Sequence, residues 1–88
     1  MKVTFRKSFD KDAKQIKDKA VKQAIVKAIL NVEDATRLTD IRGIKKMTGY
    51  KNSYRIRIGS YRIGVEIIDG VADFVRVLPR DQIYNYYP

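Results

Sequence analysis

Residues 54–67 read YRIRIGSYRIGVEI, and this stretch does most to decide which fold the chain can adopt. Apolar and polar side chains alternate on both sides of Gly59-Ser60, a pattern typical of two half-buried β-strands. The Gly59-Ser60 pair predicts a two-residue hairpin turn of the primed type. In that register Arg57 lies directly opposite Arg62 on the neighbouring strand.

Further strands are predicted on both sides of this hairpin. Residues 2–6 alternate and predict a short strand, and Asp69-Gly70 is a second hairpin signal. Residues 71–78 are apolar on both faces, which indicates a central strand that Pro79 ends. Residues 81–87 have the length for one helical turn.

Two helices are predicted between the first strand and the hairpin. Apolar residues recur at spacings of three and four from residue 13 to residue 32. Ser8 is expected to cap the start of the helical region, and Asp18 is expected to cap a second helix that turns the region into a helical hairpin. Residues 44–47 form either a short strand or the end of a connecting loop. We therefore predict an α+β fold: an N-terminal strand and a helical hairpin packed on one face of a small antiparallel sheet, with a short C-terminal helical turn.

The composition limits the possible chemistry. A chain of 88 residues is long enough for one domain. It contains no Cys and no His, which excludes disulfides, thiolate or imidazole metal ligands, and mechanisms that use either side chain. Its 19 basic and 10 acidic residues give a net charge of +9. A positive field of this size suits nucleic acid, an acidic protein or an anionic membrane.

No feature of the sequence indicates insertion into a membrane. No apolar run approaches the roughly 20 residues that a membrane-spanning helix needs. Residues 1–7 contain no apolar signal core. We expect a soluble cytoplasmic protein.

The arginines of the first hairpin are the main functional candidates. Arg55, Arg57 and Arg62 are predicted to share one face of the sheet, because side chains alternate along a strand. Residues 41–65 contain seven basic residues and no acid. Arginine forks match phosphate oxygens bidentately, so this face is a candidate phosphate site.

Other interpretations of this face remain open. The arginines can be a solvated strand face that discourages edge pairing. Glu66 lies on the same face, where it can pair with Arg55 or Arg62. Gly64 has no side chain opposite Arg55 and leaves a hollow there. Alternatively, it marks a bulge or a position where close packing leaves no room for a side chain.

The tyrosines divide into two groups. Tyr54 and Tyr61 fall on the apolar face of the hairpin and are expected in the core. Tyr84 follows Arg80 by four residues and is the better functional candidate, either as a stacking face for a base or as a reactive hydroxyl. The three C-terminal tyrosines (84, 86 and 87) can instead bury a sheet edge or serve a partner surface.

Three segments together resemble one known family. The motif of residues 54–63, the later Arg80-Asp81-Gln82-Ile83-Tyr84 and the opening residues 5–12 resemble the RelE/ParE superfamily of bacterial toxins from toxin–antitoxin pairs. The similarity spans essentially the whole chain, which implies a single RelE-like toxin domain over residues 1–88. RNase members of this superfamily cleave messenger RNA in the ribosomal decoding site without a metal, whereas other members poison gyrase.

The resemblance also implies a set of site residues. Arg62, Arg80 and Tyr84 match the arginines and the tyrosine of the RNase site, whereas Arg55 and Arg57 match positions that are often lysine. The arginines would stabilise the phosphorane that forms when the 2′-hydroxyl attacks. Lys45, Lys46 and Lys51 lie outside the matched motif and are expected to contact the RNA backbone. Pro79 stands where many relatives have histidine, which leaves the general acid unassigned and implies poor activity in free solution.

Three classes of function follow from these observations. The first, which the matched residues favour, is a ribosome-dependent endoribonuclease that needs no metal or cofactor. The second is a ParE-like toxin that poisons gyrase by protein binding, and the third is an inactive RNA-binding or regulatory module. For either toxin the expected partner is a cognate antitoxin in a hetero-oligomer, with the ribosome and messenger RNA as further partners of the RNase.

Overall fold

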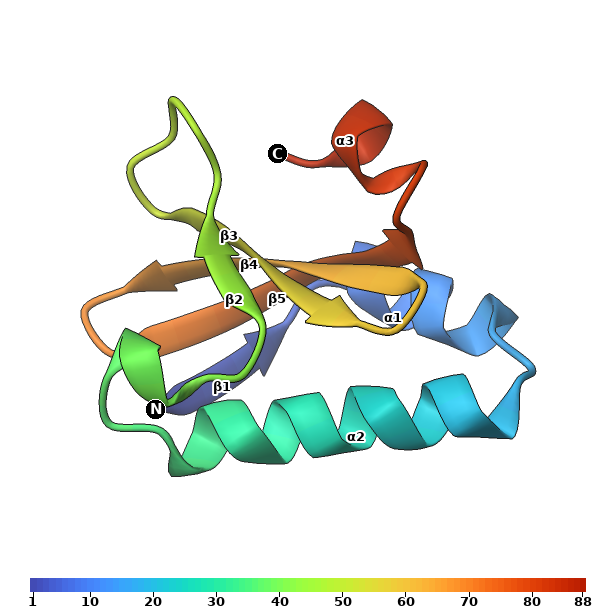
Figure 1. The fold of residues 1–88 in the computed structure, drawn as a ribbon, viewed down its shortest axis with the longest axis horizontal. Coiled ribbons are helices and arrows are strands. Elements are labelled where there is room, and N and C mark those ends of the chain that lie inside the picture. The colour runs from blue at the N-terminus through green and yellow to red at the C-terminus, as the bar shows by residue number, and fades with distance from the viewer.

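A five-stranded β-sheet forms the centre of the computed structural model, which describes all 88 residues (Figure 1). The strands are β1 (Lys2–Phe5), β2 (Ile44–Lys46), β3 (Ser53–Ile58), β4 (Tyr61–Ile68) and β5 (Val71–Pro79). Their order in the sheet is β1-β5-β4-β3-β2. The strands from β2 to β5 pair in antiparallel fashion, whereas β1 adds to β5 in parallel. The predicted α+β fold is therefore confirmed, and the sheet is mixed at its β1 edge.

Three α-helices and one short 3-10 helix accompany the sheet. They are α1 (Lys7–Gln15), α2 (Lys19–Asp34), η1 (Leu38–Asp40) and α3 (Ile83–Tyr86). The predicted break at Asp18 is confirmed, because its carboxylate accepts a hydrogen bond from the backbone N–H of Ala20 at the start of α2. The predicted cap at Ser8 is wrong. Ser8 lies inside α1, and its hydroxyl donates to the carbonyl oxygen of Val75 at 2.6 Å, which ties α1 to β5.

One main core lies between the sheet and the first two helices. It buries residues of α1, α2 and the alternating apolar face of the strands. Ile56, Ile63 and Val65 are at most 1% exposed, as their alternation in the sequence predicts. Tyr54 and Tyr61 pack against this core, which confirms their predicted place.

The hairpin of β3 and β4 adopts the predicted register. Arg57 is paired with Arg62 across the two strands. Gly59 has a φ of +60°, and no positive φ occurs at Ser60, which is the pattern of a turn with glycine at its first central position. The second predicted turn is also present, since Asp69 and Gly70 both have positive φ.

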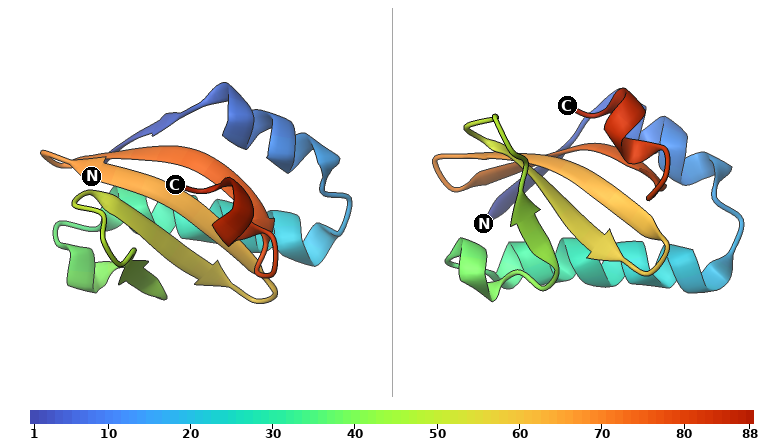
Figure 2. Two further views of the ribbon diagram at one scale, coloured as in Figure 1. Left: turned by 90° about the horizontal axis from the view of Figure 1, so that it is seen from above. Right: turned by 45° about the horizontal axis from the view of Figure 1, so that its top comes forward.

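The opposite face of the sheet is partly covered by the C-terminal segment. Figure 2 shows α3 lying over β4 and β5, on the side away from α2. A second, smaller core joins Ile83 and Tyr87 of this segment to Met47 and Val75. The uncovered part of this face therefore lies beside α3. The structure contains no helix with the length and apolar composition that a membrane span requires.

Candidate functional site

A cluster of arginines surrounds Arg62 on the face opposite α2. Arg62 is only 8% exposed, which is unusual for a charged side chain. Its Nη1 donates to the carbonyl oxygens of Gly59 at 2.8 Å and Tyr61 at 2.9 Å, so its guanidinium is held against the hairpin turn. Arg62 forms no ion pair with a carboxylate.

The electrostatics of Arg62 show which residues lie near it. Burial is the main cause that lowers the pKa of the Arg62 guanidinium from its usual value. The positive charges of Arg55, Arg57 and Arg80 lower this pKa further, whereas Tyr84 raises it. The fold thus brings together the five residues that the sequence motif singled out. Like charges gathered in this way favour binding of an anion between them.

Carboxylates on this side of the sheet neutralise other arginines. Glu66 pairs with Arg6 at 3.4 Å, and Asp73 pairs with the same arginine at 2.8 Å. Asp12 of α1 pairs with Arg76 at 2.7 Å. The alternative interpretation, in which Glu66 pairs with Arg55 or Arg62, is therefore wrong. The arginines that no carboxylate neutralises include Arg55, Arg57, Arg62 and Arg80.

Backbone contacts place Arg80 beside the hairpin. Arg80 follows the last residue of β5, and its backbone N–H donates to the carbonyl oxygen of Ser60 at 2.9 Å. This bond joins the end of β5 to the turn that Arg62 also holds. Arg57 and Arg80 are exposed, whereas Arg55 is half-buried, so the cluster is open to solvent on one side.

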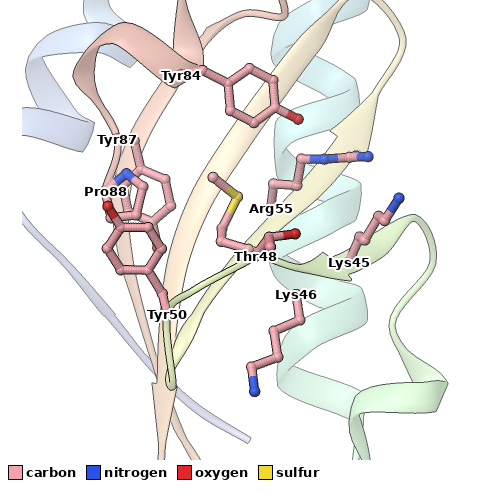
Figure 3. Close-up of a pocket in the computed structure, with 9 residues that line it drawn as sticks. Lys45, Lys46, Thr48, Tyr50, Arg55, Tyr84, Tyr87 and Pro88 are labelled. Atoms are coloured by element: carbon pink, nitrogen blue, oxygen red, sulfur yellow. The ribbon is translucent and has the colours of Figure 1, made fainter.

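A pocket of about 350 Å³ adjoins the arginine cluster between α3 and the β2–β3 loop (Figure 3). Its charged lining consists of Lys45, Lys46 and Arg55, without any Asp or Glu. Tyr84 from α3 and Tyr50 from the loop also line it. Lys51 lies on the same loop but outside the pocket. Tyr50 was missed in the sequence because an isolated loop tyrosine has no periodic pattern that assigns it to a surface.

The hollow predicted at Gly64 is filled by the ring of Tyr87. A Cβ atom at Gly64 would lie 2.6 Å from this ring, so only glycine allows the two to meet. The Tyr87 hydroxyl donates to the carbonyl oxygen of Val65 at 2.8 Å, and the residue is 2% exposed. A register shift between Gly64 and Val65 shows that the glycine also marks a bulge. Tyr87 thus covers the sheet face and not a sheet edge, and it fixes the segment that carries Tyr84.

Replacing Gly64 with alanine is expected to lower the free energy of unfolding by about 1–3 kcal/mol, because the added methyl group overlaps the Tyr87 ring. Urea unfolding measures this loss. The double variant Gly64→Ala/Tyr87→Ala is the control. With the ring gone the methyl group has space, so the double variant should lose less stability than the two single variants together. Simple additivity would show that the two residues do not meet.

The stability of the protein is expected to fall in alkali through Tyr87. Burial raises the pKa of Tyr87 to about 12, above the value of about 10 for an unfolded chain. The neutral phenol therefore contributes stability that is fully present below about pH 10 and is lost as the pH rises through 12. Urea unfolding of wild type and Tyr87→Phe between pH 8 and 12 tests this, since all other titrating groups are shared. Wild type should lose more stability than the variant above pH 10, and parallel curves would contradict the prediction.

Comparison with known proteins places the chain in a family. The family model described as the ParE toxin of the type II toxin–antitoxin system parDE matches residues 3–84. Toxin RelE3 of Methanocaldococcus jannaschii is 43% identical over the full length of both chains. The chain belongs to the RelE/ParE superfamily of toxins. The resemblance to this superfamily inferred from the motifs is thus confirmed. The description of the toxins as bacterial is not confirmed, because this relative is archaeal.

Solved structures of the same superfamily share the fold of this toxin. The RelB–RelE antitoxin–toxin complex from Methanococcus jannaschii matches with a TM-score of 0.78 and 40% identity, over 97% of this toxin and 99% of that chain. The isolated Escherichia coli RelE toxin matches with a TM-score of 0.70 and 19% identity, over 96% of this toxin and 90% of that chain. The second match, at this low identity, shows the fold alone.

Proposed function

We propose that the toxin is a ribosome-dependent endoribonuclease that cleaves messenger RNA and so stops translation. The observation that carries this proposal is the cluster around Arg62, where four arginines without carboxylate partners surround a site that Tyr84 borders. Such a cluster suits a phosphate that gains negative charge during a reaction. Membership of the RelE/ParE superfamily and the 43% identity with a RelE toxin support the same activity.

The chemistry needs no nucleophile from the protein. The 2′-hydroxyl of RNA loses its proton and its oxygen attacks the adjacent phosphorus. The bond from phosphorus to the 5′-oxygen breaks and that oxygen takes up a proton, so a cyclic phosphate and a 5′-hydroxyl result. The arginines can stabilise the pentacoordinate phosphorane between these states. They cannot accept the proton of the 2′-hydroxyl, because a guanidinium stays protonated near neutral pH.

Tyr84 is the residue of the cluster that we assign to proton transfer. It is the one member of the cluster with a hydroxyl, and it is exposed beside the pocket. Glu66, the other conceivable base, is bound to Arg6 at 3.4 Å, which disfavours that role. Pro79 offers no group that can protonate the leaving oxygen. The free toxin should therefore be a poor catalyst, and the ribosome is needed to present and activate the RNA.

We propose a cognate antitoxin as the protein partner. Several structural relatives are RelB–RelE complexes, which supports a hetero-oligomer of the same kind. With a net charge of +9, the toxin should attract an acidic or amphipathic helical segment. This charge should speed association more than it sets the final affinity.

Expression of the toxin without an antitoxin tests the proposed function. Growth should arrest, and metabolic labelling should show protein synthesis failing before DNA synthesis. The matching family model is described as a ParE toxin, so the alternative function, gyrase poisoning, needs a direct test. Early failure of DNA synthesis, with gyrase trapped on broken DNA, would replace the RNase proposal with that alternative.

Alanine at Lys45, Lys46 or Lys51 is expected to weaken RNA or ribosome binding and to make its affinity less dependent on salt. The reason is that a variant with one phosphate contact fewer releases fewer counterions when it binds. The maximal single-turnover rate should change little. Lys22→Ala on α2 is the matched control, since α2 covers the opposite face of the sheet. Binding measured over a range of salt concentrations tests the prediction. An unchanged salt slope in all three variants would remove these lysines from the RNA surface.

A further inference from the structure

We infer that the pocket between α3 and the β2–β3 loop is a nucleotide subsite, in which an RNA base packs against Tyr50 and the adjoining phosphate meets Arg55 and Lys45. This inference rests on the proposed function, because it takes RNA as the substrate. It adds a place where one base next to the arginine cluster is held.

The pocket has two chemically different ends. Figure 3 shows Tyr50, Tyr87 and Pro88 gathered at one end, and Arg55 and Lys45 projecting at the other. The first end offers apolar and aromatic surface, and the second offers positive charge. A nucleotide has the same division, with a flat base joined to an anionic phosphate, so it matches the pocket in one orientation.

The cationic end is free to bind an anion. Arg55 forms no ion pair, and Lys45 lies opposite it in the register of β2 and β3. The volume of about 350 Å³ falls in the range of small-ligand sites, roughly 300–1,000 Å³. Arg55 also belongs to the cluster around Arg62, so a phosphate at this end would lie next to the proposed cleavage site.

The aromatic end is largely preformed. Met47 at the start of the loop is buried, and its backbone N–H donates to the carbonyl oxygen of Ser53 at 2.8 Å. The backbone N–H of Tyr50 donates to the carbonyl oxygen of Met47 at 3.2 Å, and Tyr87 is fixed over Gly64. Tyr50 is nevertheless 50% exposed. An exposed ring on a fixed support is suited to stacking on a base, which depends little on base identity.

A binding experiment with a short oligonucleotide tests the subsite. An all-deoxy trinucleotide cannot be cleaved by 2′-oxygen attack, and NMR titration measures its affinity for the complete toxin. Tyr50→Ala should weaken binding by roughly 10- to 100-fold, whereas Tyr50→Phe should stay near wild type. Tyr86→Ala is the matched control, because Tyr86 is 60% exposed and lies outside the pocket. The centre of its ring lies 5.5 Å from Cζ of Arg76.

A trinucleotide with one abasic position separates stacking from phosphate binding. Wild type should bind it more weakly than the intact trinucleotide, and Tyr50→Ala should bind both alike. On ribosomes, Tyr50→Ala should raise the half-saturating toxin concentration by a larger factor than it lowers the maximal cleavage rate.

The outcomes distinguish this inference from the proposed function. The subsite would be overturned if Tyr50→Ala had the same trinucleotide affinity and the same half-saturating concentration as wild type. If the wild-type toxin still cleaved messenger RNA in that case, the RNase proposal would stand. Trinucleotide binding that depends on Tyr50, without any cleavage, would support the subsite and refute the RNase. An effect of Tyr50→Ala on antitoxin binding alone would overturn the subsite.

Discussion

Replacing Arg80 or Arg62 with alanine is expected to lower the single-turnover rate of messenger RNA cleavage on the ribosome by about 10²–10³-fold, which is typical for the loss of one preorganised donor. Both guanidiniums lie in the cluster that should meet the phosphorane, where the negative charge grows. The phosphate of the bound substrate carries less negative charge on the same oxygens than the phosphorane does. Each variant should therefore lose less in substrate affinity than in cleavage rate. Arg42→Ala is the control, because Arg42 is an exposed arginine outside the matched motif.

The two variants differ in what else they disturb. Arg62 holds two carbonyl oxygens of the hairpin turn, so Arg62→Ala should also lower the free energy of unfolding, by about 1–3 kcal/mol. Arg80 is exposed, and Arg80→Ala should unfold like wild type. A rate loss in Arg80→Ala is therefore the cleaner sign of chemistry. Full activity in both variants would show that the site is wrong.

Replacing Tyr84 with phenylalanine is expected to lower the same rate by about 10²–10⁴-fold, because the phenolic oxygen assigned to proton transfer is lost while the ring remains. Rapid-quench cleavage of ribosome-bound messenger RNA measures the effect. Tyr86→Phe provides the control, since it removes a hydroxyl two residues away on the same helix.

A comparison with Tyr84→Ala decides between the two roles of this ring. Similar large losses in the phenylalanine and alanine variants would support proton transfer. Near-normal activity of Tyr84→Phe together with failure of Tyr84→Ala would mean that the ring stacks on a base and that another group takes the proton.

The hairpin could be predicted from the sequence because its information is local. A period of two places Ile56 and Ile63 on the core face of the sheet and Arg57 and Arg62 on the opposite face, and the Gly59-Ser60 turn sets their register. The same local rules predicted the cap at Asp18. The gathering of Arg55, Arg57 and Arg62 on one face therefore followed from alternation alone.

The remaining features depend on contacts between distant segments. Nothing near Gly64 in the sequence indicates that Tyr87, 23 positions later, fills its hollow. Glu66 could be placed on the correct face, but its partner Arg6 comes from the other end of the chain. The parallel pairing of β1 with β5 and the contact of Ser8 with Val75 have the same cause. The pocket itself exists because the C-terminal segment folds back over the sheet beside the β2–β3 loop.

The most direct test of the RNase activity is to map the ends of messenger RNA after purified toxin is added to programmed ribosomes with an occupied or an empty decoding site. We predict a break within the decoding site that appears with wild-type toxin, needs the ribosome, requires that site to be empty of tRNA, and forms about 10²–10³-fold more slowly with Arg80→Ala. Intact messenger RNA, together with gyrase–DNA complexes trapped by the same preparation, would contradict the proposed activity.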